Sequence, residues 1–481
     1  MIGPAIKVDA DEWRHATQAI AAGRRTLVAL WGGVGHVLMA TRGPGDLGIL
    51  QLDCPDGAFP SVAARHPPAI RLERTMRDLY GLSPLGAPDE RPWLDHRRWA
   101  VRHPLGRAQA TRALTPYPFL AADGDGLHQV AVGPVHAGVI EPGQFLIHAS
   151  GETVVRLEER LGFVHRGLEA RMIGADLAQA SRLAGRASGD STVAYSLAFA
   201  RAVEGALGIE APPRAQWLRA LMAELERLAN HIGDIGAICN DAAFGLMHAH
   251  CAALREQALR AAAAAFGHRL MMDRVVPGGV ALDLETPGVE VIRRFLAHAR
   301  ERLPRLVSLY DDTASLQDRT VGTGVVPPEL AGRYGAGGFV GRACGVAFDA
   351  RKAFPYAPYD QLDFEVPTRT EGDVNARVWV RIEEASATLG LIGQILDGLP
   401  AGAATCPVPE ATGEGAALVE GFRGDVFAWV RLAGGQVESA HLRDPSWFQW
   451  PLLEAAIEGA IVADFPLCNK SFNCSYAGVD L

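Results

Sequence analysis

The spacing of hydrophobic positions changes along the chain and predicts where strands give way to helices. Residues 26–40 and 47–52 have the continuous or alternating apolar pattern of strands, and residues 9–22 predict a short helix opened by acids. An amphipathic pattern at 69–80 predicts a second helix, which leads into a loop rich in Gly and Pro. Together these elements predict a compact α+β domain over residues 1–103.

The chain changes character twice after this domain. Residues 104–120 contain Pro104, Pro116 and Pro118 and show no clear period, so we expect a linker there. From 129 to 158, apolar and polar residues alternate between Gly-Pro, Glu-Pro-Gly and Ser-Gly-Glu turns, which predicts a small β-sheet.

Long helical patterns dominate the rest of the sequence. The clearest runs from Pro212 to about Cys239, where Leu218, Leu221 and Leu225 belong to a 3.6-residue repeat. Further helices are predicted over 191–207, 252–271, 288–311 and 376–399, and a surface loop over 407–415. The predicted fold class is α+β: a small N-terminal α/β domain, then a large, mainly α-helical domain over 121–481 with a small β-sheet at its start.

The composition of the chain argues against several classes of function. Of 481 residues 48% are hydrophobic, and the formal net charge of -9 gives nucleic-acid binding no electrostatic support. The apolar stretches fall short of the roughly 20 residues that span a bilayer, and the N-terminus lacks a secretory signal pattern, so we expect the cytoplasmic side. Seven scattered cysteines contain no C-x-x-C pair, which argues against disulfides and against an iron–sulfur or zinc site: Cys54, Cys239, Cys251, Cys344, Cys406, Cys468 and Cys474.

The glycine-rich segments do not indicate a soluble NAD-dependent dehydrogenase. Such an enzyme needs a strand followed by G-x-G-x-x-G and a later acid. Residues 32–35 and 335–338 lack that context, so this class is excluded.

The first part of the chain resembles a known family. The arrangement of Glu73, Asp78, Arg91, Trp93 and Trp99 resembles the 30-kilodalton-type subunit of respiratory complex I. An acidic helix followed by a polar loop is the plainer alternative.

The second part resembles a second family over most of its length. RLGFVHRGLEARMIG from Arg160 and APPRAQWLRALMAELERLANHI from Ala211 resemble the 49-kilodalton-type subunit of complex I and the large subunit of membrane-bound group 4 nickel–iron hydrogenases, of the formate hydrogenlyase and hydrogenase-4 type. Similar segments follow in the same order from Val276, Val321, Gly341 and Gly372. The resemblance thus describes a fusion of the two subunit types.

The hydrogenase resemblance implies a metal site whose ligands are missing. Those enzymes hold nickel and iron with four thiolates, two in an Arg-x-Cys-Gly-x-Cys motif and two in a C-terminal Asp-Pro-Cys-x-x-Cys motif. The alignment places Ser188 and Ser191 at the first pair and Ser475 and Gly478 at the second. The chain is therefore expected to bind no metal and to be most similar to the energy-converting hydrogenase-related proteins, which lack these ligands.

The quinone-binding residues of complex I are also only partly present. The family uses a tyrosine in the first motif and two histidines in a Gly-Pro-Gln-His-Pro-x-x-His strand. Here the tyrosine position is Gly189, His136 matches the first histidine and Ile140 the second. Asp241 aligns with the acid that supports the quinone histidine, and Tyr195 lies nearby in the alignment, so both are candidates for a rebuilt polar pocket.

Two interpretations stay open for the residues of the first motif. Arg186 either serves the active-site cavity or forms an ordinary ion pair, for which Asp241 is a candidate partner. Ser188 and Ser191 either bind a polar ligand, or Ser188 caps the following helix.

The remaining candidates come from two other segments. His165 and Arg166 either face an iron–sulfur small subunit, as in the relatives, or form a structural turn with Gly167. Arg342, Asp349, Arg351 and Lys352 form a charged cluster that either lies by the cavity and partner interface or is a solvated loop.

Taken together, the resemblance implies a peripheral-arm subunit of a membrane-associated complex-I-like oxidoreductase on the cytoplasmic face of the inner membrane. The expected reaction is electron transfer to quinone or another small acceptor. The chain itself would bind no cofactor, because the 4Fe–4S cluster belongs to a PSST-like iron–sulfur small subunit. A ferredoxin-like subunit and membrane antiporter-like subunits are the other expected partners. The alternative is a non-catalytic scaffold that links the peripheral and membrane arms.

Overall fold

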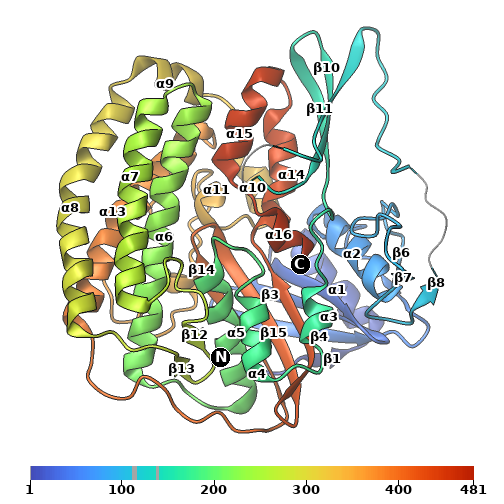
Figure 1. The fold of residues 1–481 in the computed structure, drawn as a ribbon. Helices are drawn as coiled ribbons and strands as arrows, with labels where there is room; N and C mark the ends of the chain where they lie inside the picture. The colour runs from blue at the N-terminus through green and yellow to red at the C-terminus, as the bar shows by residue number, and fades with distance from the viewer. Residues whose placement is uncertain (1, 111–115, 137–139) are drawn as a thin grey trace.

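The structure is a computed structural model that describes residues 2–110, 116–136 and 140–481 (Figure 1). Its N-terminal sheet has the order β1-β4-β3-β2, in which β1 (Ile6–Val8) pairs parallel to β4 (Asp46–Asp53). The predicted strand 26–40 is a hairpin of β2 (Thr26–Gly33) and β3 (His36–Gly43), because Gly35 turns the chain at a φ of 75°. Its helices are α1 (Ala10–Ala21) and α2 (Ile70–Tyr80), so the predicted α+β character is confirmed.

Short elements complete the N-terminal part. Asp9 begins α1 with a capping box, in which its carboxylate accepts from the backbone of Asp11 and Glu12. The α2 helix ends at Gly81, whose φ of 73° is left-handed. The paired short strands are β5 (Ala58–Pro60) with β6 (Ser83–Leu85), and β7 (Val101–Arg102) with β8 (Gln109–Ala110).

The small β-sheet predicted over 129–158 is present. It consists of β9 (Leu127–Val132), β10 (Gln144–Ser150) and β11 (Thr153–Arg160), with β10 in the middle. Figure 1 shows β10 and β11 standing beside α14 and α15. The short helices α3 (Leu168–Met172) and α4 (Leu177–Ala184) follow.

A helical bundle forms the other half of the molecule (Figure 1). Its members α6 (Pro213–Asp241), α7 (Gly245–Phe266), α8 (Thr286–Asp311) and α13 (Val374–Gly398) pack against one another. The predicted helix 252–271 begins earlier and ends earlier, because Gly267 takes a left-handed φ of 71°. Smaller elements between them are β12 (Val275–Val276), β13 (Gly279–Val280), α9 (Ala314–Thr320), α10 (Pro328–Tyr334), α11 (Gly338–Arg342) and α12 (Ala350–Ala353).

A three-stranded sheet that the sequence pattern did not predict joins the two halves. The order is β14 (Gly413–Gly421), β15 (Gly424–Ala433) and β16 (Gln436–Arg443), and α5 (Thr192–Leu207) lies along β14 and β15. Trp31 of β2 packs on Phe427 and Trp429 of β15, with ring centroids 5.6 and 5.5 Å apart. The hydrophobic core therefore continues from the N-terminal part into the rest of the chain.

The last helices are α14 (Ser446–Ile457), α15 (Phe465–Phe472) and α16 (Tyr476–Asp480). They lie between the bundle and the N-terminal part (Figure 1). Among the described residues, no helix is both long enough and apolar enough to cross a membrane.

Candidate functional site

A polar cavity of about 310 Å³ lies where four segments that are distant in sequence meet. They are the residues before β10, the loop before α5, the turn between β14 and β15, and the stretch from α15 to the start of α16. The lining residues are Ile140, Glu141, Ser188, Gly189, Asp190, Arg423, Asn469, Lys470, Asn473, Cys474, Ser475 and Tyr476.

Two motif positions that are far apart in sequence meet in this cavity. The hydroxyls of Ser188 and Ser475 lie 2.8 Å apart, and the Ser188 hydroxyl donates to Asp190 at 3.0 Å. Ser475 in turn accepts from the backbone N–H of Gly478 at 2.9 Å. The fold therefore brings the first and second motifs together as the alignment implied.

An ion pair beside these hydroxyls gives the cavity its charge. Both terminal nitrogens of Arg423 donate to the carboxylate of Asp190, at 2.7 and 2.5 Å, and one of them also donates to Ser191 at 3.2 Å. The Arg423 side chain is 5% exposed, whereas that of Asp190 is 35% exposed. Burial alone would raise the pKa of Asp190, but the Arg423 guanidinium holds it below its ordinary value. Asp190 is thus an anionic hydrogen-bond acceptor.

Tyr195 lies behind the cavity rather than in its wall. It is fully buried, and its hydroxyl donates to Asp444 at 2.7 Å. Burial, with the neighbouring Asp444, raises the pKa of Tyr195 well above its ordinary value, so its proton stays on the oxygen. A Cβ atom added at Gly478 would lie 2.4 Å from the same Asp444 carboxylate. The carboxylate therefore occupies the space beside Gly478, the residue that the alignment places at the fourth ligand position.

Three predicted residues lie elsewhere in the described structure. Arg186 pairs with Asp273, at 2.5 and 2.8 Å, and not with Asp241. Asp241 ends α6, where burial raises its pKa despite the opposing charge of Lys470. His136 bonds through Nε2 to the Gly143 carbonyl at 2.8 Å. In the described chain, Arg186, Asp241 and His136 are all outside the lining of the polar cavity.

The idea that Ser188 caps α5 is wrong. Ser191 is the N-cap residue, and its side chain makes no capping bond. The carboxylate of Glu226 on α6 accepts from the backbone of Val193 at 2.7 Å and of Ala194 at 3.1 Å instead. Burial raises the pKa of Glu226 to about 8, although these bonds oppose the shift. Ser188 is therefore free to bond within the cavity.

The charged cluster around Arg342 is a buried network, so its interpretation as a solvated loop is wrong. Arg342 is fully buried and donates to Glu384 at 2.6 Å and to Glu420 at 3.0 Å. Arg351 donates to Asp349 at 2.6 Å and to Glu224 of α6 at 2.9 Å. These contacts tie α11 and α12 to α6, α13 and β14.

Lys352 differs from the buried members of that cluster. Its side chain is exposed, and its ammonium lies 4.1 Å from the ring centroid of Phe364. It is the cluster member that remains on the surface of this chain.

His165 and Arg166 hold the turn next to the first motif. His165 donates from Nδ1 to the Asp480 carbonyl at 2.6 Å. The Arg166 guanidinium donates to the carbonyls of Arg186 and Ala187, each at 2.8 Å, directly before Ser188. Gly167 allows the turn with a φ of 65°. This turn positions the loop that carries Ser188.

The cysteines near the C-terminus do not form a ligand set in the described residues. Cys474 lines the polar cavity but has a pKa raised well above its ordinary value by burial. Burial also raises the pKa of Cys468 to about 11. Across 2–110, 116–136 and 140–481, no three His, Cys, Asp or Glu side chains gather where they could hold a metal ion.

Comparisons with known proteins match three parts of the chain to families. Residues 36–113 match the 30 Kd subunit of respiratory-chain NADH dehydrogenase, and residues 243–412 match its 49 Kd subunit. Residues 166–233 match the nickel-dependent hydrogenases.

Several relatives extend over most of the chain. Formate hydrogenlyase subunit 5 of Escherichia coli (strain K12) is 32% identical over 90% of this chain and 78% of its own. The carbon monoxide-induced hydrogenase of Rhodospirillum rubrum is 33% identical over 72% of this chain and 97% of its own. An NADH-quinone oxidoreductase subunit of Gluconacetobacter diazotrophicus is 29% identical over 92% of this chain and 83% of its own.

A solved structure supports the same relationship. The membrane-bound sulfane sulfur reductase, an archaeal respiratory membrane complex, has a chain that superposes with a TM-score of 0.70 and 28% identity, over 75% of this chain and all of that one. The fold and the motifs define a large subunit of the complex I and nickel–iron hydrogenase type, homologous to subunits of enzyme complexes. More closely, the chain belongs to the family that fuses complex I 30-kDa-type and 49-kDa-type subunits and is related to the formate hydrogenlyase and hydrogenase-4 large subunits.

Proposed function

We propose that this chain is a peripheral-arm subunit of a membrane-associated, hydrogenase-4-like oxidoreductase, and that its polar cavity receives a small electron acceptor. The meeting of Ser188 with Ser475 carries the proposal, because it puts hydroxyls at motif positions that hold metal ligands in the hydrogenases. A 4Fe–4S cluster in a PSST-like partner subunit would supply the electrons. A ferredoxin-like subunit and antiporter-like membrane subunits complete the proposed assembly.

The proposed acceptor is a quinone headgroup or another small polar molecule. The cavity offers the charges of Arg423 and Lys470 as donors to acceptor oxygens. The hydroxyls of Ser188 and Ser475 add oxygens that accept hydrogen bonds, because the single hydrogen of Ser188 is already donated to Asp190 and that of Ser475 to Ser188. Asp190, as a carboxylate, orients the Ser188 hydroxyl and holds Arg423 in place. His165 and Arg166 shape the loop, and the face they adjoin is the proposed contact with the iron–sulfur subunit.

We also propose that the chain does not assemble a nickel–iron centre. Serine hydroxyls are hard oxygen ligands and do not replace the soft thiolates that such a centre uses. The Asp444 carboxylate beside Gly478 supports the proposal, because a ligand side chain there would have to displace it. No step of the proposed reaction passes through nickel.

The domain division belongs to the proposal as well. Residues 1–103 would form the 30-kDa-like unit, 104–120 the linker and 121–481 the large-subunit unit. The continuous core between β2 and β15 supports a fixed arrangement of the two units.

A scaffold that links the peripheral and membrane arms is the second candidate function. The buried network of Arg342, Glu384 and Glu420 favours it, because such a network ties several helices into one rigid body. The two candidate functions differ in one measurable property: the proposed redox subunit binds an electron acceptor, and the scaffold does not.

The test uses the intact purified complex. Elemental analysis should find iron without stoichiometric nickel, and hydrogen uptake should be absent. Stoichiometric nickel together with hydrogen uptake would contradict the proposal.

A second experiment measures the rate at which a soluble quinone reoxidises the reduced clusters of the partner subunit. Asp190→Asn should slow acceptor-dependent reoxidation by about tenfold or more, because a charged hydrogen-bond partner is lost. Asp273→Asn is the matched control, since Asp273 also pairs with an arginine and is 34% exposed against 35% for Asp190. Equal rates in wild type and both variants would favour the scaffold.

A further inference from the structure

Another cavity, of about 320 Å³, lies at the outer edge of the sheet formed by β14, β15 and β16. Residues 416–418 of β14 form one wall, and residues 353–355 at the end of α12 form another. Ile2 and Leu47 close it from the N-terminal part. Of the described residues that line it, only Arg201 of α5 carries a charge. This Arg201 cavity shares no lining residue with the polar cavity.

The guanidinium of Arg201 has no acceptor in the described parts of the chain. It forms no hydrogen bond or ion pair there, and its Cζ lies over the ring of Tyr356, 4.6 Å from the centroid. The acids that influence it are bound elsewhere, since Glu204 accepts from Arg219 at 3.1 Å and Glu210 accepts from a glutamine at 3.1 Å. A guanidinium has five N–H donors and stays charged in proteins, so this side chain lacks a partner.

The terminal nitrogens of Arg201 are accessible to a molecule in the cavity. Its Nε is enclosed, whereas the two terminal nitrogens are not among the enclosed atoms, and the residue as a whole is half-buried. Most of the exposed wall is polar, although the other side chains in the lining are hydrocarbon. The guanidinium and nearby backbone groups therefore supply the polar surface of this cavity.

A backbone N–H of β14 adds a second donor at the same edge. The N–H of Glu420 is donated to the hydroxyl of Tyr356 at 3.2 Å, on the side of β14 away from β15. Backbone N–H groups two residues apart in a strand point to the same side, so the N–H of Leu418 also points to the outer edge. Leu418 lines the cavity, which thus has donors from both α5 and β14.

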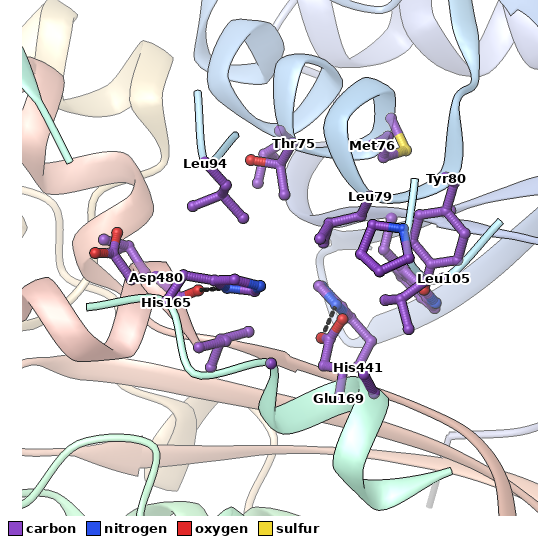
Figure 2. A pocket seen from close by; sticks show the side chains of 18 of the residues that line it. Thr75, Met76, Leu79, Tyr80, Leu94, Leu105, His165, Glu169, His441 and Asp480 are labelled. Carbon is purple, nitrogen blue, oxygen red and sulfur yellow. Dashed lines mark hydrogen bonds and ion pairs between the residues drawn. The ribbon is translucent and has the colours of Figure 1, made fainter. Parts of the chain in front are cut away.

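The cavity of about 290 Å³ beside α2 differs in the state of its charged residues (Figure 2). Its lining includes Arg166, Glu169 and Asp480, and each of them has partners within the chain. Arg166 donates to two backbone carbonyls, and the carboxylate of Asp480 accepts from two backbone N–H groups. Figure 2 shows the pair of Glu169 with His441, whose Nδ1 lies 2.8 Å away. The unpaired charge of Arg201 therefore distinguishes its cavity from this one.

The charges around Arg201 define the class of the missing partner. A partly buried cation without a partner costs free energy, which an anion in the cavity offsets. Burial lowers the pKa of Arg201 below its ordinary value, although Tyr356, Glu204 and Glu210 oppose the shift. One guanidinium neutralises one negative charge, and a second charge on the ligand would be repelled by the two nearby glutamates. The charge balance therefore favours a singly charged anion.

The shape and lining of the cavity define the rest of the ligand. Its volume is at the lower end of the range for small-molecule sites, roughly 300–1,000 Å³, and its side chains other than Arg201 are hydrocarbon. We propose that this cavity binds a monocarboxylate with a small apolar body, whose oxygens accept from the terminal nitrogens of Arg201. The site is separate from the acceptor cavity and does not depend on the proposed function.

The test measures binding of benzoate and of benzyl alcohol, which has a similar size but no charge, to the purified complex by equilibrium dialysis. Benzoate should bind about tenfold or more tightly, because only benzoate forms charge-assisted hydrogen bonds. Arg201→Gln should abolish this preference. Arg201→Lys keeps the charge but loses the planar fork, so it should bind benzoate several-fold more weakly than wild type.

Arg160→Gln is the matched control. Arg160 is also half-buried, has an enclosed Nε without a partner, and lies over a tyrosine ring, with its Cζ 4.4 Å from the centroid of Tyr117. It is outside the lining of the Arg201 cavity, so its variant should bind benzoate like wild type. Benzoate should also raise the melting temperature of wild type and of Arg160→Gln, and leave that of Arg201→Gln unchanged.

Two results would overturn the proposal. One is benzoate binding to wild type that is absent or no tighter than that of benzyl alcohol, because the cavity then does not recognise the charge. The other is benzoate binding that Arg201→Gln leaves unchanged, which would place the anion elsewhere in the complex. Melting curves without ligand confirm that each variant is folded before binding is compared.

Discussion

The polar cavity and the Arg342 network are both clusters of charged residues, yet they differ in what surrounds them. In the network, Arg342, Glu384 and Glu420 are almost fully excluded from solvent and bond to one another. In the cavity, Asp190 keeps about a third of its side chain exposed beside two serine hydroxyls. Charge density therefore does not distinguish a structural cluster from a ligand site, whereas access to an open space does.

Breaking the buried network should have the largest effect on stability. Arg342→Met leaves Glu384 and Glu420 buried without their partner, so the free energy of unfolding should fall by about 3–5 kcal/mol. Urea unfolding of the purified chain measures this. Arg305→Met is the control, because Arg305 pairs with Glu301 on the surface, and it should cost less than about 1 kcal/mol. Equal losses in both variants would remove the distinction between the two clusters.

The buried carboxyl of Glu226, which bonds to the first turn of α5, predicts that the free energy of unfolding depends on pH. Burial raises its pKa from an ordinary 4.5 to about 8, so the folded chain binds this proton more tightly than the unfolded chain. The stabilisation is fully present below about pH 4.5 and is lost as the pH rises through about 8, by at most about 1.4 kcal/mol per pH unit. Glu226→Gln should flatten the unfolding free energy between those values, and an unchanged slope would contradict this.

The hydroxyl of Tyr195 should contribute less to stability than the Arg342 network or the protonated carboxyl of Glu226. Tyr195→Phe removes the donor to Asp444 and leaves that carboxylate with the backbone N–H of Ser446. The expected loss is about 2 kcal/mol, measured as a lower midpoint of urea unfolding. A neutral result would mean that solvent reaches Asp444, and the space beside Gly478 would then be open.

Helical periodicity predicted the bundle, but not the sheet that joins it to the N-terminal part. The long helices α6, α8 and α13 have apolar repeats over many turns, so their positions followed from the sequence. Strands β14 and β15 are buried nearly throughout, because α5 and the N-terminal sheet cover both faces. Strands buried on both faces show no alternation, and this sheet was therefore missed.

In the candidate site, too, the sequence predicted the residues that lie in local motifs but not the pairs of residues that only the fold brings together. Ser188 and Ser475 were found because each lies in a motif with fixed spacing. Asp190 and Arg423 are 233 residues apart, and no local pattern connects them before the chain folds. Asp241 was one candidate partner for Arg186, but the partner is Asp273, which lies on a loop whose position the sequence does not define.

The smallest effect on stability should come from the ion pair of Asp190 with Arg423 in the polar cavity. This variant therefore tests most directly whether the polar cavity differs from the Arg342 network. In Asp190→Asn the side-chain oxygen still accepts a bond from Arg423, and the position is partly solvated, so the unfolding free energy should fall by only about 1 kcal/mol. Acceptor-dependent reoxidation should nevertheless slow far more than in Asp273→Asn. A variant that loses several kcal/mol and keeps its reoxidation rate would show that Asp190, like Arg342, is structural. That result would contradict the proposal that electrons are transferred to an acceptor in the polar cavity.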